Sequence, residues 1–164
     1  MTTDDVTTRL LAYRDAAAGS LPSSFPTVTV ALGWATVELE RAVGELAEAL
    51  GVPAVRFVPA AVSEVLGARC LVADAALPDG SALVVLEPAA EGRLAATLAR
   101  FGEGPAAIWF AARDDAGAEG VAPGGEPPTR PGRLGPLGVE HLVLGGPIHG
   151  PHRLLVGLPG TIHP

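Results

Sequence analysis

The feature of the sequence that most restricts its fold is a change of hydrophobic period near residue 39. Residues 27–39 read TVTVALGWATVEL, and their β-branched residues and alternating apolar positions predict a strand. Residues 40–51 read ERAVGELAEALG, where apolar positions recur at helical spacing up to Gly51, a residue type that commonly ends helices. A strand followed at once by an amphipathic helix indicates a fold that combines both kinds of element.

Three further strands are predicted directly after that helix. Residues 54–62, 68–77 and 81–88 read AVRFVPAAV, ARCLVADAAL and SALVVLEP. The PDG between the last two, at 78–80, is a hairpin signal. The first part of the chain therefore has the order βαβββ.

The rest of the chain predicts a second, incomplete set of the same elements. A connector with a short helix, 89–104, leads to a fifth strand, AAIWFAA, at 106–112. VEHLVL at 139–144 and HRLLVGL at 152–158 predict a terminal hairpin. The Gly- and Pro-rich stretch 112–136 predicts a loop or lid. We interpret this as a second half of similar strand content that is eroded.

Composition narrows the class of protein. The chain has 164 residues, which suits one compact domain preceded by a short helix at 4–18. Its 11 basic residues are scattered and are outnumbered by 18 acidic ones, which argues against nucleic acid as a partner because phosphate neutralisation needs clustered cations. Cys70 is the only cysteine, and neither a signal peptide nor an apolar run of membrane-spanning length is present. These features predict a cytoplasmic protein that does not bind membranes.

Three segments carry a resemblance to a known family. They are VELERAVGELAEALG at 37–51, LEPAAEGRLAATLARFGEG at 86–104 and GPHRLLVGL at 150–158. In order and spacing they resemble the vicinal oxygen chelate superfamily, which includes glyoxalases, bleomycin-resistance proteins and dioxygenases, and most of all its methylmalonyl-CoA epimerase-like branch. The resemblance implies an α+β fold in which paired βαβββ-type modules form a curled mixed sheet, or half-barrel, around a concave site.

The resemblance also implies a division of the chain. An N-terminal helix and linker occupy residues 1–27, and a glyoxalase-like domain occupies 28–164. Within that domain we place the first module at 28–88, the connector at 89–104 and an eroded second module at 105–158.

The family's metal ligands are replaced in this sequence. Members of the superfamily usually hold a divalent metal in the concavity, and the four corresponding positions here are Ala31, Val84, Ala107 and Leu154. A divalent ion needs several converging oxygen or nitrogen donors, and these side chains offer none. We therefore predict no metal and no other cofactor.

Five polar residues are the candidates for catalysis. His149 and His152 flank a Gly-Pro turn, and either could transfer protons near neutral pH. Asp74 would have a raised pKa if it faced an apolar interior, and Arg153 could stabilise an enolate oxygen. His141 shares a strand face with valines. For the histidines and Asp74 the alternative interpretation is an ordinary solvated or structural side chain.

The candidates for substrate binding are Trp34, Trp109, Phe57 and Arg56. The two tryptophans lie on the strands that carry the family's two histidines, so they are predicted to line or fill the same concavity. Stacking on a flat ligand and simple filling of the core are the two roles considered.

Two principal functions remain open at this stage. One is a metal-independent enzyme of the isomerase, cyclase or lyase type that transfers a proton at a carbonyl-containing hydrophobic metabolite, for example one of secondary metabolism. The other is a non-catalytic binding or self-resistance protein that sequesters a hydrophobic natural product. A third reading is a structural subunit, and an exposed sheet edge predicts a homodimer in every case.

Overall fold

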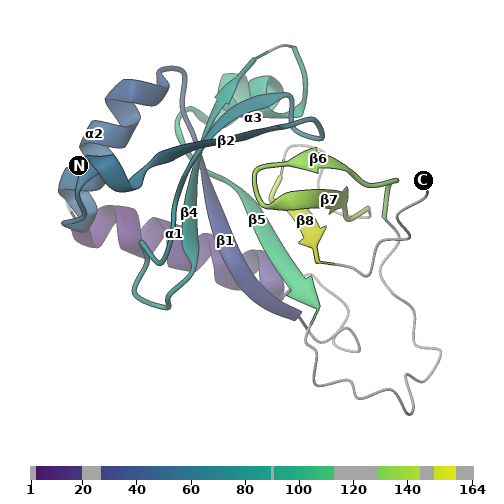
Figure 1. The fold of residues 1–164 in the computed structure, drawn as a ribbon, viewed down its shortest axis with the longest axis horizontal. Coiled ribbons are helices and arrows are strands. Elements are labelled where there is room, and N and C mark those ends of the chain that lie inside the picture. The colour runs from purple at the N-terminus through teal and green to yellow at the C-terminus, as the bar shows by residue number, and fades with distance from the viewer. Residues whose placement is uncertain (1–2, 20–26, 90, 113–128, 145–149, 158–164) are drawn as a thin grey trace.

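The computed structural model describes residues 3–19, 27–89, 91–112, 129–144 and 150–157. Among these residues no helix is long and apolar enough to cross a membrane. Figure 1 shows the elements in chain order: α1 (Thr3–Ala18), β1 (Thr27–Ala35), α2 (Leu39–Leu50), the 3-10 turn η1 (Ala54–Arg56), β2 (Val58–Ser63), β3 (Ala68–Ala73), β4 (Ala82–Pro88), α3 (Arg93–Phe101), β5 (Gly104–Ala112), β6 (Arg133–Gly135), β7 (Gly138–Leu142) and β8 (His152–Val156).

All eight strands form one mixed sheet in the order β2-β3-β4-β1-β5-β8-β7-β6. The sheet divides into two similar halves, because β1 is parallel to β4 in the first and β5 is parallel to β8 in the second. The halves join where β1 and β5 run antiparallel at the centre. The strands of the second half are short, with three residues in β6 and five in each of β7 and β8. The predicted pair of βαβββ-type modules, with a reduced second module and an added N-terminal helix, is confirmed.

Two details of the sequence interpretation are wrong. β6 lies inside the stretch 112–136 that the Gly and Pro content assigned to a loop, and three residues are too few for an alternating pattern to reveal a strand. Arg56 lies in η1 and not on a strand. Its backbone N–H bonds the carbonyl of Pro53 at 3.0 Å, so the chain turns there before β2 begins.

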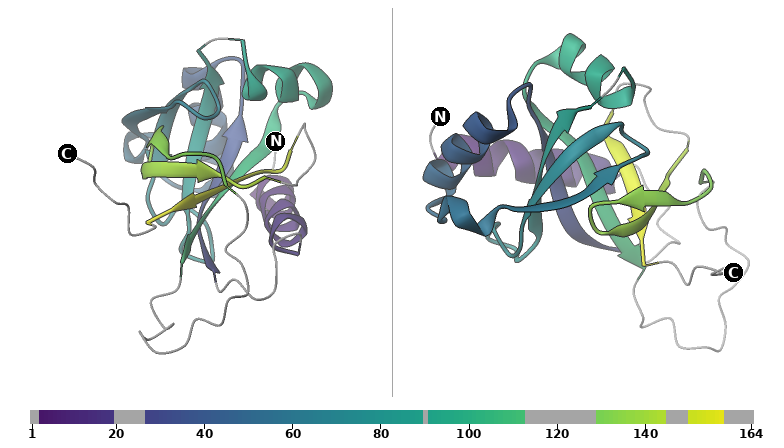
Figure 2. Two further views of the ribbon diagram at one scale, coloured as in Figure 1. Left: turned by 90° about the vertical axis from the view of Figure 1, so that its right-hand side faces the viewer. Right: turned by 45° about the horizontal axis from the view of Figure 1, so that its top comes forward.

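The sheet curls until its two edges meet. The backbone N–H of Glu64, just after β2, donates to the carbonyl of Leu134 on β6 at 3.0 Å. In the left view of Figure 2 the β6–β7 hairpin crosses in front of the central strands. The half-barrel is therefore nearly closed, and its two faces differ in what covers them.

The outer face of the sheet is covered by α1 and α2, and the inner face packs mostly on itself. Apolar residues of α1, α2 and the outward-facing strand positions form the outer core, which includes Leu10, Leu32, Leu46, Ile108 and Phe110. The inner core is formed by the inward-facing strand positions with α3, and it includes Ala31, Val84, Leu94, Trp109 and Leu154.

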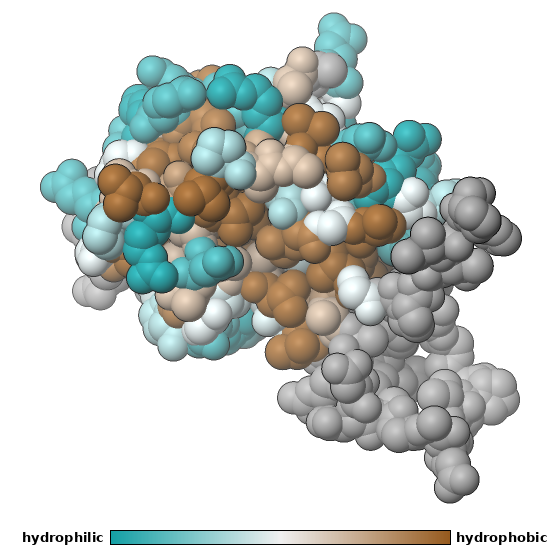
Figure 3. Space-filling model, in the orientation of Figure 1, coloured by the Kyte–Doolittle hydropathy of each residue, from teal (hydrophilic) through white to brown (hydrophobic). Residues whose placement is uncertain are grey.

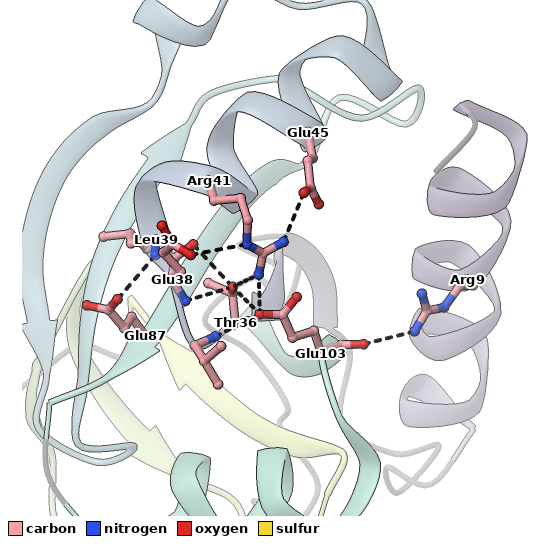
Figure 4. Close-up of polar contacts among 9 residues, drawn as sticks. Arg9, Thr36, Glu38, Leu39, Arg41, Glu45, Glu87 and Glu103 are labelled. Carbon is pink, nitrogen blue, oxygen red and sulfur yellow. Dashed lines mark hydrogen bonds and ion pairs between the residues drawn. The ribbon is translucent and has the colours of Figure 1, made fainter.

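A polar network fixes the connector between the modules, as Figure 4 shows. The carboxylate of Glu103 accepts hydrogen bonds from the Thr36 hydroxyl at 2.7 Å and from Arg41 at 2.6 Å. Burial opposes ionisation of Glu103, but these bonds outweigh it and lower its pKa to about 2. Glu87 accepts from the backbone N–H of Leu39 at 3.2 Å and so caps the start of α2. Both glutamates of the connector motif are thus used to hold α2 and β5 in place.

Candidate functional site

The concavity of the curled sheet has no donors at the family's metal positions. Ala31, Val84, Ala107 and Leu154 are all fully buried and belong to one packed cluster, the inner core. They therefore share one face of the sheet, as the resemblance requires. Among the described residues, no three His, Cys, Asp or Glu side chains gather where they could hold a metal ion. The residues present do not fit the family's divalent metal.

The indole of Trp109 fills the space beside these positions. A β-carbon added at Gly33 would lie 2.9 Å from the Ala107 Cβ, the Leu86 Cδ1 and the Trp109 Cζ3, which is too close for real carbon atoms. Trp109 itself is fully buried. The interior around β1 and β5 is therefore close-packed protein, as in other cores.

A buried carboxyl group completes the interior. Glu140 on β7 is fully buried and accepts a hydrogen bond from the Trp109 Nε1–H at 2.8 Å. It also accepts one from the hydroxyl of Ser63 on β2. β2, β5 and β7 are not neighbours in the sheet, so only a contact across the inside of the barrel brings these three side chains together.

Burial raises the pKa of Glu140, and the two hydrogen bonds counteract only part of this shift. The nearby thiol of Cys70 is affected in the same way, since burial raises its pKa to about 12. Burial therefore shifts both groups toward their neutral forms. The raised pKa that was predicted for a carboxyl group inside the barrel is therefore found at Glu140.

Among the described residues, an open cavity lies at the mouth of the barrel, between the end of β2, the start of α3 and the strand β6. This cavity has a volume of about 270 Å³ and is named here the arginine pocket. Its lining consists of three arginines, one glutamate and three apolar residues: Arg93, Arg130, Arg133, Glu64, Val65, Pro131 and Leu142. Leu142 is buried in the inner core, and Val65 packs against it, so the apolar part of the pocket is continuous with the filled interior.

Charge in the arginine pocket is unbalanced. Arg133 lies 3.8 Å from the carboxylate of Glu64, a long contact between two exposed side chains. Within the described part of the chain, the guanidinium groups of Arg93 and Arg130 have no carboxylate or carbonyl acceptor. The pocket therefore offers positive charge that the described residues do not neutralise.

The predicted catalytic residues do not converge on one place. Asp74 is exposed just after β3, and His149 lies outside the described residues. His152 is buried beneath α3, where its Nε2 is 2.9 Å from the Thr97 hydroxyl oxygen. Arg153, the next residue on the same strand, points to the opposite face, and burial lowers the pKa of its guanidinium. His141 is partly exposed, with its Nδ1 3.3 Å from the carbonyl of Arg130.

The predicted binding residues are divided between the two cores. Trp109 is in the inner core, whereas Trp34 and Phe57 are in the outer core, and Arg56 is exposed. The prediction that both tryptophans share the concavity is wrong for Trp34. Trp34 is three positions from Ala31 and so faces the other side of the strand, while Trp109 is two positions from Ala107 and faces the same side.

A second, smaller cavity of about 150 Å³ lies beside Trp34, under α1 and α2. Its charged lining is already paired, because the Arg9 guanidinium stacks over the Trp34 ring and donates to the carbonyl of Glu103. We therefore consider the arginine pocket the better candidate site.

The sequence analysis missed Glu140, Ser63 and the arginine pocket. For Glu140 a signal was present: in VEHLVL it alternates with Leu142, which predicts that the two share a face. The arginines of the pocket come from α3 and from residues 130–133, and no local pattern connects segments so far apart in the chain.

Comparisons with known proteins establish the fold. No protein-family model and no curated protein sequence matches the chain. Methylmalonyl-CoA epimerase from Mycobacterium tuberculosis is 20% identical over 85% of this chain and 93% of its own, with a TM-score of 0.58. A methylmalonyl-CoA epimerase solved with methylmalonyl-CoA and ammonium is 26% identical over 79% of this chain and 93% of its own, with a TM-score of 0.54.

A variant of the Streptomyces coelicolor epimerase, in complex with 2-nitronate-propionyl-CoA, is 24% identical over 80% of this chain and 96% of its own, with a TM-score of 0.54. The chain therefore has the fold of the vicinal oxygen chelate superfamily, and its structural neighbours include isomerase-type enzymes. The resemblance in the sequence is confirmed at the level of the fold.

Proposed function

We propose that this chain is a metal-independent, non-catalytic binding protein, which takes a small molecule at the mouth of the barrel. The observation that carries the proposal is the contrast between a filled concavity and an open arginine pocket beside it. Trp109 and the apolar replacements of the metal ligands occupy the concavity, whereas the pocket keeps about 270 Å³ of space. Of the functions considered from the sequence, sequestration of a small molecule needs only this pocket.

The lining of the pocket supports binding over catalysis. Within the described lining, the one ionisable residue besides the arginines is the exposed Glu64. A general acid or base works best with a pKa near the operating pH, which an environment of burial or neighbouring charge has to create. The pocket therefore has groups that attract a ligand but none that is prepared for proton transfer.

One observation favours a second candidate, a proton-transfer enzyme of the isomerase, cyclase or lyase type. Glu140 is a buried carboxyl group with a raised pKa, and the backbone of Val65, which lines the pocket, lies close enough to influence it. In this reading the β6–β7 hairpin separates from β2 to admit a carbonyl-containing substrate. Glu140 would then move the proton, and an arginine of the pocket would stabilise the enolate oxygen.

Exchange of an α-proton separates the two candidates. The protein is incubated in D2O with methylmalonyl-CoA, a ligand of one structural neighbour, and the α-proton is followed by NMR with chelator and with added Co²⁺. If the chain only binds the ligand, the α-proton exchanges no faster with the protein than in buffer alone, both with chelator and with Co²⁺. Exchange above that rate would refute the proposal, and its loss in Glu140→Gln would assign the chemistry to Glu140.

Homodimerisation and a cytoplasmic location are part of the proposal. Apolar side chains gather on the face of the molecule where β2, β6 and β7 lie, as Figure 3 shows. The exposed members of this group are Val58, Val62, Leu134 and Val139. A second copy would remove them from water. Sedimentation equilibrium that gives a mass of one chain at micromolar concentration would refute the dimer.

A further inference from the structure

We infer that the ligand of the arginine pocket is a small oxyanion, a carboxylate or a phosphate ester, with a short apolar tail. This inference rests on the proposed binding function and names its ligand class. It follows from three properties of the pocket, which are its unpaired charge, the type of its cations and the division of its lining into charged and apolar parts.

The charge of the pocket is opposite to that of the whole chain. The protein carries a formal charge of −7, yet three of its 11 basic residues line one cavity that contains a single carboxylate. Three other arginines in the described structure are paired with a carboxylate. Arg14 lies 2.7 Å from Asp79, Arg41 lies 2.6 Å from Glu103 and Arg69 lies 2.7 Å from Glu87.

Like charges in one cavity repel each other, so the arrangement is unfavourable unless an anion enters. Arg93 and Arg130 lack such an acceptor within the described residues, as shown above. An anion held between them would gain charge-assisted hydrogen bonds that nothing in the pocket now supplies.

The cations are all of one kind. The sequence contains no lysine, and each basic residue is an arginine. A guanidinium group presents its N–H donors as a planar fork that matches the two oxygens of a carboxylate or phosphate. The pocket is therefore better suited to a planar or tetrahedral oxyanion than to a halide or to a neutral polar group.

The apolar part of the pocket and its volume define the rest of the ligand. Val65 and Leu142 are the more buried part of the lining, whereas Arg130, Arg133 and Glu64 are exposed. A ligand would thus lay its tail on the buried side and its oxyanion toward the rim. The volume of about 270 Å³ lies just below the ~300–1,000 Å³ of typical ligand pockets, so only a small metabolite or the end of a longer one fits.

Calorimetric titration of the full chain with simple probes tests the inference. Hexanoate and n-butyl phosphate represent the two sources of the oxyanion, inorganic phosphate lacks the tail, and hexan-1-ol lacks the charge. We expect both tailed anions to bind more tightly than phosphate and hexanol, and their affinity to fall as salt is raised. Binding by only one tailed anion would identify carboxylate or phosphate as the true head group.

Variants of three arginines separate the pocket from general charge. Arg93→Gln and Arg130→Gln should each weaken the tailed anions about tenfold or more, because a charged hydrogen bond is lost. Arg100→Gln is the matched control, since Arg100 lies on the same helix but stacks on Phe101 outside the pocket. Arg93→Lys keeps the charge and should still lose affinity, because it removes the fork.

Two results would overturn the inference. If Arg93→Gln and Arg130→Gln, with circular dichroism like the wild type, bind the anions unchanged, the arginine pocket is not the site. If hexanol binds as tightly as hexanoate, the ligand class is wrong while the proposed binding function survives. A different result would refute the binding function itself, namely α-proton exchange that is faster with the protein than in buffer alone.

Discussion

The inside of the barrel and the arginine pocket at its mouth differ in whether their polar side chains have partners within the protein. Inside, the carboxyl group of Glu140 accepts hydrogen bonds from two side chains and lies beside the apolar inner core. At the mouth, three guanidinium groups face one cavity and only one has a carboxylate nearby. The first arrangement is complete without a ligand, and the second is not.

This difference separates the role of the fold from the role of the site. In the superfamily the concavity is the place for a metal and a substrate, and here the same strands use it as a second hydrophobic core. Because the interior is packed with side chains, the arginine pocket at the rim is where space for a ligand remains on this side of the sheet. If the interior is a structural core, substitutions inside the barrel should lower the free energy of unfolding, whereas substitutions at the mouth should leave it nearly unchanged.

The largest effect is expected for Trp109→Ala. Removing a fully buried tryptophan from a core destabilises a protein by about 3–5 kcal/mol, and here it also takes one donor from Glu140. Urea unfolding measures the loss, with the exposed Val62→Ala as a control near zero. The cavity left by the ring should accept indole, so added indole should raise the midpoint of the variant and not of the wild type. A loss under about 1 kcal/mol would show that the interior is not a packed core.

A smaller loss is expected for Gly33→Ala. Its new methyl group would meet Ala107, Leu86 and Trp109 at 2.9 Å, and such overpacking costs about 1–3 kcal/mol. Gly44 in α2 is the matched control, because a β-carbon there meets nothing within 4 Å. Gly44→Ala should stabilise the protein by about 0.5–1 kcal/mol, since alanine is the better helix former. Equal effects of the two substitutions would contradict the close packing around Trp109.

How far the sequence could predict this molecule depends on the range of the pattern involved. The change of period near residue 39 and the PDG turn are local, and the order of elements in the first module followed from them correctly. The two-residue spacing of Ala107 and Trp109 is local too, and it places both side chains on the inner face of the sheet. The three-residue spacing of Ala31 and Trp34 places Trp34 on the other face, although the prediction put both tryptophans in the concavity.

The contacts that define the site are not local. Ser63, Trp109 and Glu140 come from three strands that meet only because the sheet curls and closes. The alternation with Leu142 places Glu140 on the apolar face of β7, but its hydrogen-bond partners Ser63 and Trp109 come from strands that no local pattern connects to it. The arginine pocket also brings together distant segments, α3 and the residues around β6. Its cluster of positive charge could therefore not be predicted from a sequence in which the basic residues are scattered.

A change in pH dependence is the third expected effect. Burial raises the pKa of Glu140 in the folded state above the unfolded value of about 4.3. Its contribution to stability is therefore present in full below that pH and is lost as pH rises through the folded-state pKa. Glu140→Gln cannot ionise, so its stability relative to wild type should increase as pH rises from 4 to 8, and each tenfold tighter binding of the proton in the folded state corresponds to about 1.4 kcal/mol.

Urea unfolding at several pH values measures this difference. The exposed Glu48→Gln is the control and should run parallel to wild type. Parallel curves for Glu140→Gln as well would mean that the interior tolerates the charge, and the contrast between inside and mouth would then be weaker than the geometry indicates.

The smallest effect on stability is expected at the mouth itself. Exposed charges away from a core usually change the free energy of unfolding by no more than about 0.5 kcal/mol, so Arg130→Gln and Arg133→Gln should unfold almost like the wild type. Arg133→Gln should be the less stable of the two by a small margin, because only Arg133 lies near Glu64. If an anion stabilises the wild type by mass action, it should do so less in both variants although neither is destabilised on its own. A large loss of stability in either variant would tie the mouth to the core, because the guanidinium group would then be a structural part of the closed barrel and would not be available to a ligand.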